Sequence, residues 1–221
     1  MRNAAFYAFI FLGFFVACSD PEPIEPFSND NLTDTSGTVL PYDLSMSFDH
    51  EKIKYSFFNG QNGYYNSVFQ QTDTFSCPDD SLGQYRVFSL FSGMRGQSTL
   101  YPEMQIRIME CVEYDPAFGI TQARMDSILQ VAEYDYFDST MNGMMAEVIF
   151  IDKDTVMWSS STGSNDFSAT SRFFISAILD NPDQDASRRI VYGQFSGFLY
   201  NAEGDTMAVS NGQFKSRFIR P

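Results

Sequence analysis

The sequence contains a single histidine, His50, and three cysteines among its 221 residues. Protein zinc sites use several histidine and cysteine ligands, so this composition argues against zinc. A Ser-His-Asp site would have to use His50, but the sequence has no Gly-x-Ser-x-Gly motif to present a serine nucleophile. Gly-rich phosphate-binding motifs are absent as well. We therefore expect a protein that is not an enzyme.

Basic residues are also scarce, because 14 Lys and Arg stand against 28 Asp and Glu, for a formal net charge of −14 at pH 7. Nucleic acids and anionic lipid headgroups both require a basic protein surface. The charge argues against both as partners and is compatible with cations and neutral ligands. A carboxylate-dependent hydrolase is an alternative, because 28 acidic residues form many pairs whose separation the sequence does not give.

Long apolar runs are few, and the one that stands out extends from Ala4 to Val16, after Arg2 and before Ala17 and Cys18. It is too short to cross a bilayer as a helix but has the length of the apolar region of a signal peptide. The small residue directly before a cysteine resembles the lipobox of bacterial lipoproteins, in which the cysteine is lipidated. We predict a signal peptide over residues 1–17 and a lipid on Cys18. A cleaved secretory signal that leaves Cys18 as a thiol is the alternative.

Residues 18–40 interleave prolines with acidic residues, beginning with Asp20, Pro21, Glu22 and Pro23. Such a chain favours an extended conformation without a core. We predict an acidic, Pro-rich tether here and a single β-rich domain over residues 41–221. Acidic residues after the lipidated cysteine resemble the export signal of surface lipoproteins in Bacteroidota-type bacteria. That resemblance implies an outer-membrane lipoprotein of the cell envelope, displayed at the surface; a simple spacer is the alternative.

The composition favours strands over helices, because the chain has 23 Phe, 12 Tyr and 14 Gly but few Ala or Lys. Alternating patterns predict strands over Ser45–Phe58, Tyr64–Thr74, Tyr85–Phe91, Met104–Tyr114, Phe167–Leu179 and 189–221, and a hairpin over Met144–Trp158. We predict a mostly β fold, an antiparallel β-sandwich, with a flattened or lipocalin-like β-barrel as the alternative. One apolar stripe at helical spacing predicts a covering helix over Thr121–Ala132.

The C-terminal strands contain closely spaced Gly and Phe, as in residues 193–197 and 211–214. These glycines are expected to let a neighbouring strand or ring approach closely. Together with residues 204–206, the segments resemble the C-terminal signature of uncharacterised lipoproteins from Bacteroidota-type bacteria. The resemblance implies a β-sandwich or barrel-like domain of unknown activity, and it carries over no catalytic residues.

Cys77 and Cys111 remain once Cys18 is assigned to the lipid. In an oxidising compartment they can form a disulfide that closes a loop of about 35 residues. Two buried thiols are the alternative, because the sequence does not show proximity. We predict the disulfide.

Two groups of residues are candidates for ligand binding. Asp180, Asp183 and Asp185 could bind calcium, although a solvated acidic loop is the simpler interpretation. Exposed aromatic rings could stack on a sugar or a protein partner, unless a two-layer core buries them; the candidates are Tyr64, Tyr65, Trp158, Tyr192 and Tyr200. We expect a lipid-anchored, non-enzymatic binding or accessory protein whose ligand is a glycan or an envelope protein. A structural subunit of an outer-membrane assembly is the alternative.

Overall fold

The computed structural model describes residues 44–77, 85–98, 101–115, 127–137, 143–161, 171–180 and 188–219. These residues form eleven strands and almost no helix, which confirms the mostly β fold. The strands are β1 (Ser45–His50), β2 (Ile53–Phe58), β3 (Tyr64–Ser76), β4 (Tyr85–Gly96), β5 (Glu103–Glu113), β6 (Glu133–Tyr136), β7 (Met145–Ile151), β8 (Met157–Ser159), β9 (Arg172–Asp180), β10 (Arg188–Tyr200) and β11 (Thr206–Ile219).

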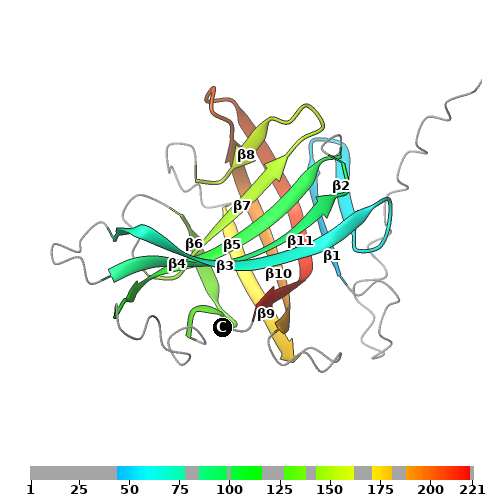
Figure 1. The fold of residues 1–221 in the computed structure, drawn as a ribbon. Helices are drawn as coiled ribbons and strands as arrows, with labels where there is room; N and C mark the ends of the chain where they lie inside the picture. Colours follow the sequence, from blue (N-terminus) through cyan, green and yellow to red (C-terminus); the bar gives the residue numbers. More distant parts are fainter. Residues whose placement is uncertain are drawn as a thin grey trace, which may run out of the picture.

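All eleven strands belong to one sheet, in the order β2-β1-β11-β10-β9-β6-β7-β5-β4-β3, with β8 paired to β7 and β10. The sheet folds onto itself: β3, β4, β5 and β7 form one layer and cross over β9, β10 and β11 of the other (Figure 1). The short strand β6 joins the layers by pairing with β7 and β9. Its pairing with β7 is parallel, which corrects the expectation of a purely antiparallel sheet. The architecture combines features of the sandwich and the flattened barrel.

Aromatic side chains from both layers fill the interior. The ring of Phe48 on β1 lies 5.1 Å from that of Phe150 on β7, and the rings of Phe57 on β2 and Tyr64 on β3 are 5.4 Å apart. Edge-to-face contacts of this kind add about 1 kcal/mol each to the stabilisation from burial. Because the side chains of the described strands occupy the interior, a ligand is to be sought on an outer face.

The first predicted strand, Ser45–Phe58, is in fact a hairpin of β1 and β2. The chain reverses at Glu51, which adopts a φ of 54° that the alternating pattern does not reveal. Phe57 points into the core, but Ile53 is 55% exposed. Ile53 directly follows the turn on a strand at the edge of the sheet, where no neighbouring strand covers it.

The close approach expected at the C-terminal glycines is confirmed. Gly193 on β10 pairs with Phe214 on β11, and Phe195 pairs with Gly212. A Cβ atom on either glycine would overlap the ring of its partner. Asn211, with a φ of 50°, adds a bulge to β11 where it faces β1, so Asn211-Gly212 lies inside a continuous strand.

The hairpin of β7 and β8 is also confirmed, and the side chain of Asp152 holds its turn. Its Oδ1 accepts hydrogen bonds from the backbone N–H groups of Asp154 (2.9 Å) and Val156 (3.0 Å). Phe150 is buried, but Val156, which is also apolar, is exposed. The aspartate bonds fix Val156 in the turn, outside the alternating part of the hairpin.

The expected helix over 121–132 falls partly outside the described residues, which begin here at Ser127. Ser127 and Ile128 are helical, but the helix ends before Ala132, so the predicted end is wrong. The Tyr134 hydroxyl accepts a hydrogen bond from the Gln130 N–H (2.8 Å) and lies 2.9 Å from the Ile128 carbonyl oxygen, which holds the chain in a turn. No helix in the described part of the chain is long and apolar enough to cross a membrane.

Candidate functional site

A groove of about 400 Å³ lies on the outer face of the sheet, across β6, β9, β10 and β11. Its volume falls within the range of roughly 300–1,000 Å³ typical of small-molecule sites. Most of its lining is polar. The lining residues are Glu133, Arg172, Phe174, Gln194, Phe195, Ser196, Asn211, Gly212 and Gln213.

Four lining residues form a row across the strands. Glu133 pairs with Phe174, Phe174 pairs with Gln194, and Gln194 pairs with Gln213. Directly paired residues point to the same face of a sheet, and neighbouring strands lie about 4.8 Å apart. The row therefore extends over about 14 Å from β6 to β11.

Two strand pairs, β10 with β11 and β11 with β1, are irregular at the groove. The register between β10 and β11 shifts between Phe195 and Gly197, and that between β11 and β1 shifts at Asn211. The Asn211 side chain donates a hydrogen bond to the Asp49 carboxylate (2.9 Å). Gly212 has no side chain, so the ring of Phe195 reaches the floor of the groove beneath it. Bulges of this kind re-aim side chains and are frequent at functional sites.

Tyr136 of β6 fixes the strands beneath the groove from the core side. Its hydroxyl lies 2.9 Å from the Ser196 carbonyl oxygen and 3.1 Å from that of Arg172. Ser196 and Arg172 are paired residues that line the groove. Burial raises the pKa of Tyr136 well above its usual value, and the hydrogen bond to Ser196 offsets only part of that rise. The hydroxyl is therefore a protonated donor at physiological pH.

Four long polar side chains of the groove are not used by the fold. Those of Glu133, Arg172, Gln194 and Gln213 make no hydrogen bond or ion pair with another residue in the described part of the chain. The groove offers a carboxylate acceptor, a guanidinium donor, and two amides that both donate and accept. This set can hold a polar molecule through several hydrogen bonds at once.

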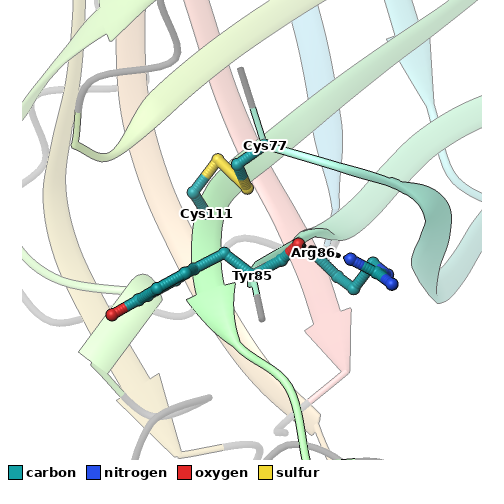
Figure 2. The surroundings of a disulfide bond; sticks show 4 residues. All are labelled: Cys77, Tyr85, Arg86 and Cys111. Atoms are coloured by element: carbon teal, nitrogen blue, oxygen red, sulfur yellow. Dashed lines mark hydrogen bonds between the residues drawn. A yellow bond between two sulfur atoms is a disulfide. The ribbon is translucent and has the colours of Figure 1, made fainter. Parts of the chain in front are cut away.

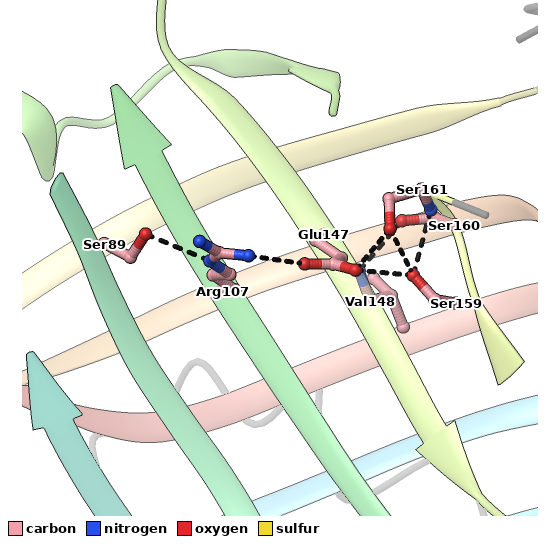
Figure 3. Close-up of polar contacts among 7 residues, drawn as sticks. All are labelled: Ser89, Arg107, Glu147, Val148, Ser159, Ser160 and Ser161. Atoms are coloured by element: carbon pink, nitrogen blue, oxygen red, sulfur yellow. Dashed lines mark hydrogen bonds and ion pairs between the residues drawn. The ribbon is translucent and has the colours of Figure 1, made fainter. Parts of the chain in front are cut away.

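The opposite layer carries polar side chains of the same types, but in a closed network (Figure 3). The Glu147 carboxylate accepts hydrogen bonds from Ser159 (2.6 Å) and Ser161, and an ion pair joins it to Arg107 (3.3 Å). The Arg107 Nε donates to Ser89 (3.0 Å). Glu147 is 6% exposed, so its contacts are with the protein and not with solvent. We assign this network to structure, not to ligand binding.

The expected disulfide between Cys77 and Cys111 is present, with a Cα–Cα distance of 6.0 Å (Figure 2). Cys77 directly follows β3 and Cys111 lies on β5, so the bridge passes over β4, the strand between them. The two cysteines pack with four apolar side chains into a second, smaller core. These are Val87, Met109 and Met145, which are buried, and Phe137, which is partly buried.

The five aromatic residues expected to stack on a ligand do not form a common surface, and none lines the groove. Tyr64 is 5% exposed and its hydroxyl donates to the Pro102 carbonyl oxygen (3.0 Å), so it is a core residue and unavailable to a ligand. Tyr65 is exposed on β3, remote in sheet order from β9 and β10.

The other three aromatic candidates are half-buried. Trp158 donates to Asp152 (3.0 Å) and packs against the core, while Lys215 lies over the ring of Tyr192. Tyr200 ends β10, where it pairs with Ser159.

Cys18, Asp183 and Asp185 lie outside the described residues, and Asp180 is described only through its backbone, at the end of β9. The lipid and calcium expectations stay predictions. In the described ranges, no group of three or more metal-ligating side chains occurs.

The groove residues were missed because each stands alone in its own strand. Phe174 had a signal, since it alternates with the apolar Phe173 and Ile175 and therefore had to point outward. Gln194 and Gln213 lie in the Gly/Phe segments of the C-terminal signature, but only the strand register brings them together with Phe174.

Comparisons of the chain with models of known protein families, with curated proteins and with solved structures found no match. Function is therefore inferred from the groove and from the chemistry of its side chains.

Proposed function

We propose that this chain is a non-enzymatic binding protein of the bacterial cell envelope, anchored in the outer membrane by a lipid on Cys18. Its ligand occupies the groove across β6, β9, β10 and β11. The observation that carries the proposal is the set of long polar side chains that line the groove and that the fold leaves without partners. Polar groups converging in a concave site are the usual mark of ligand binding.

The lining favours binding over hydrolysis. Glycoside hydrolysis uses two carboxyl groups on either side of the scissile bond. Glu133 is the one carboxylate among the groove residues that the structure describes. His50, the single histidine, contacts the Ala208 carbonyl oxygen (2.9 Å) and does not line the groove. A carboxylate-dependent hydrolase is therefore the weaker proposal.

One feature favours the alternative of a structural subunit in an outer-membrane assembly. β3 ends the hydrogen-bonded order of the sheet and is thirteen residues long. Phe69 and Gln70, near the middle of this strand, are exposed. A strand at the edge of a sheet can pair with a strand of another protein.

The anchor is tested by fractionating the producing cells. Cys18→Ser in the full-length chain should move the protein out of the membrane fraction. Retention of the variant in that fraction would overturn the lipid anchor.

The groove is tested in living cells with a photo-crosslinking amino acid at Gln194, and, as a matched exposed glutamine on another strand, at Gln70. We expect an adduct at Gln194 that Phe174→Ala reduces. An adduct at Gln70 alone would favour the assembly subunit. Absence of adducts at both positions would overturn both functions.

A further inference from the structure

We infer that the groove binds an uncharged oligosaccharide, with the ring of Phe174 as its stacking platform and Gln194 and Gln213 as its hydroxyl partners. The inference rests on the proposed binding function and names its ligand class. It goes beyond that function because a binding groove could equally take a peptide or a charged molecule.

Phe174 supplies the apolar surface. It is 41% exposed, whereas Phe173 and Ile175 on either side of it are fully buried in the core. β9 lies in the interior of the sheet, between β6 and β10, so the exposure of Phe174 does not come from an edge position. A pyranose ring is apolar on its C–H faces, and an exposed aromatic ring in a groove buries one such face.

The groups around the ring match sugar hydroxyls. A hydroxyl both donates and accepts a hydrogen bond, and so does the side-chain amide of Gln194 and of Gln213. Glu133 adds an acceptor and Arg172 adds donors. A ring flanked by acceptors and donors in one row therefore has partners for hydroxyls on either side of it.

The charges select an uncharged ligand. Glu133 and Arg172 carry opposite charges, so the lining as a whole favours neither an anion nor a cation. The chain has a formal net charge of −14, which repels polyanions at longer range. Acidic polysaccharides are thus disfavoured relative to neutral ones.

The strand pairing disfavours a peptide. Extended peptides gain most of their affinity by adding to the free edge of a sheet. Each of β6, β9, β10 and β11 has a neighbouring strand on both sides, so the groove has no free edge. Recognition here has to occur through side chains, and the row of about 14 Å is longer than one sugar ring. The ligand is consequently an oligosaccharide that lies across the strands.

The test is isothermal titration of the full-length chain in detergent with short neutral oligosaccharides, namely α-glucan, β-glucan, mannan and xylan fragments, and with oligogalacturonate as the charged probe. At least one neutral class should bind. Phe174→Ala should weaken that binding about tenfold, and Gln194→Ala or Gln213→Ala by about three- to tenfold. Tyr65→Ala and Gln70→Ala, which remove exposed side chains of the same kind on β3, should leave it unchanged.

Three results would overturn the inference: no neutral sugar binds, only oligogalacturonate binds, or Phe174→Ala binds like the wild type. The crosslinking result then separates the two proposals. A protein adduct at Gln194 that depends on Phe174, with a flat sugar panel, preserves the binding function and overturns the sugar. A flat panel without any adduct at Gln194 overturns both.

Discussion

The outer faces of the two layers each contain an arginine and a glutamate, which are paired in one layer and unpaired with described residues in the other. In the first layer Arg107 and Glu147 pair with each other and with serines, and both are largely removed from solvent. In the second layer Arg172 and Glu133 line a groove without a partner in the described part of the chain. The proposed binding groove thus differs from the closed network in that the fold leaves the polar ends of these two side chains without partners, and not in the residue types themselves.

Strand register explains the difference. Arg107 on β5 directly opposes Glu147 on β7, so the two charges meet across the strands. Glu133 on β6 instead opposes Phe174 on β9. An aromatic ring thus stands where a positive charge would have neutralised the carboxylate.

The largest effect is expected from the disulfide, which belongs to the closed layer alone. The double variant Cys77→Ser/Cys111→Ser should lose about 4 kcal/mol of unfolding free energy, because the bridge closes a 34-residue separation. Urea unfolding with and without reductant measures the loss. Ligand affinity at the groove should be unchanged, and a parallel loss of affinity would show that the two faces are not independent.

The carboxylates provide the sharpest test of the comparison. Glu147→Ala should cost about 3 kcal/mol, because it leaves Arg107 partly buried without its partner. Glu133→Ala should change the unfolding free energy by less than about 0.5 kcal/mol, since its side chain makes no hydrogen bond or ion pair with the residues that the structure describes. Equal losses in the two variants, measured by urea unfolding, would contradict the assignment of structure to one face and binding to the other.

A smaller effect is expected beneath the groove. Tyr136→Phe removes the hydroxyl that holds the Ser196 and Arg172 carbonyl groups, which should cost about 1 kcal/mol and weaken ligand binding. Tyr134→Phe removes a similarly buried hydroxyl that does not contact groove residues, so it should lower stability by a similar amount and leave binding intact. Identical binding in both variants would argue against the positioning role of Tyr136.

The last effect is absent at neutral pH and appears only in alkaline solution. Burial raises the pKa of Tyr64 and of Tyr134 from 10.0 to about 12. A raised folded-state pKa means that the stabilisation is complete below pH 10 and is lost as pH rises from there through 12. The unfolding free energy of the wild type should therefore be lower at pH 11.5 than at pH 9. The same difference should be smaller in Tyr64→Phe. A pH-independent wild type would contradict the burial of these hydroxyls.

Sequence patterns predicted the strands whose apolar residues alternate strictly. Val191, Phe195 and Leu199 are buried on one face of β10, as their spacing requires. The disulfide was predictable as a pair because only two cysteines remained after Cys18. Turns were harder to predict, since the reversal at Glu51 depends on a positive φ and not on a turn-forming residue type.

The groove was not predictable for a different physical reason. β6 has four residues that alternate between acidic and aromatic side chains, which is the shortest length at which alternation predicts a strand, and no strand was predicted there. It nevertheless supplies Glu133 and Tyr136 to the site. The site also needs partners on β9, β10 and β11, and only tertiary pairing sets which of their residues face one another. Tyr64 shows the opposite error, because this aromatic residue beside a turn was predicted to bind a ligand and is buried in the core.

The bridge between Cys77 and Cys111 also makes the covalent state of the chain depend on the compartment in which it resides. Thiols stay reduced in the cytosol and are oxidised in export compartments. Export from the cytosol, which the proposed envelope location requires, would therefore change the chain covalently while its amino-acid sequence stays the same. Trapping free thiols at successive times after synthesis tests this, because oxidation of the two cysteines would shift the electrophoretic mobility of the exported chains.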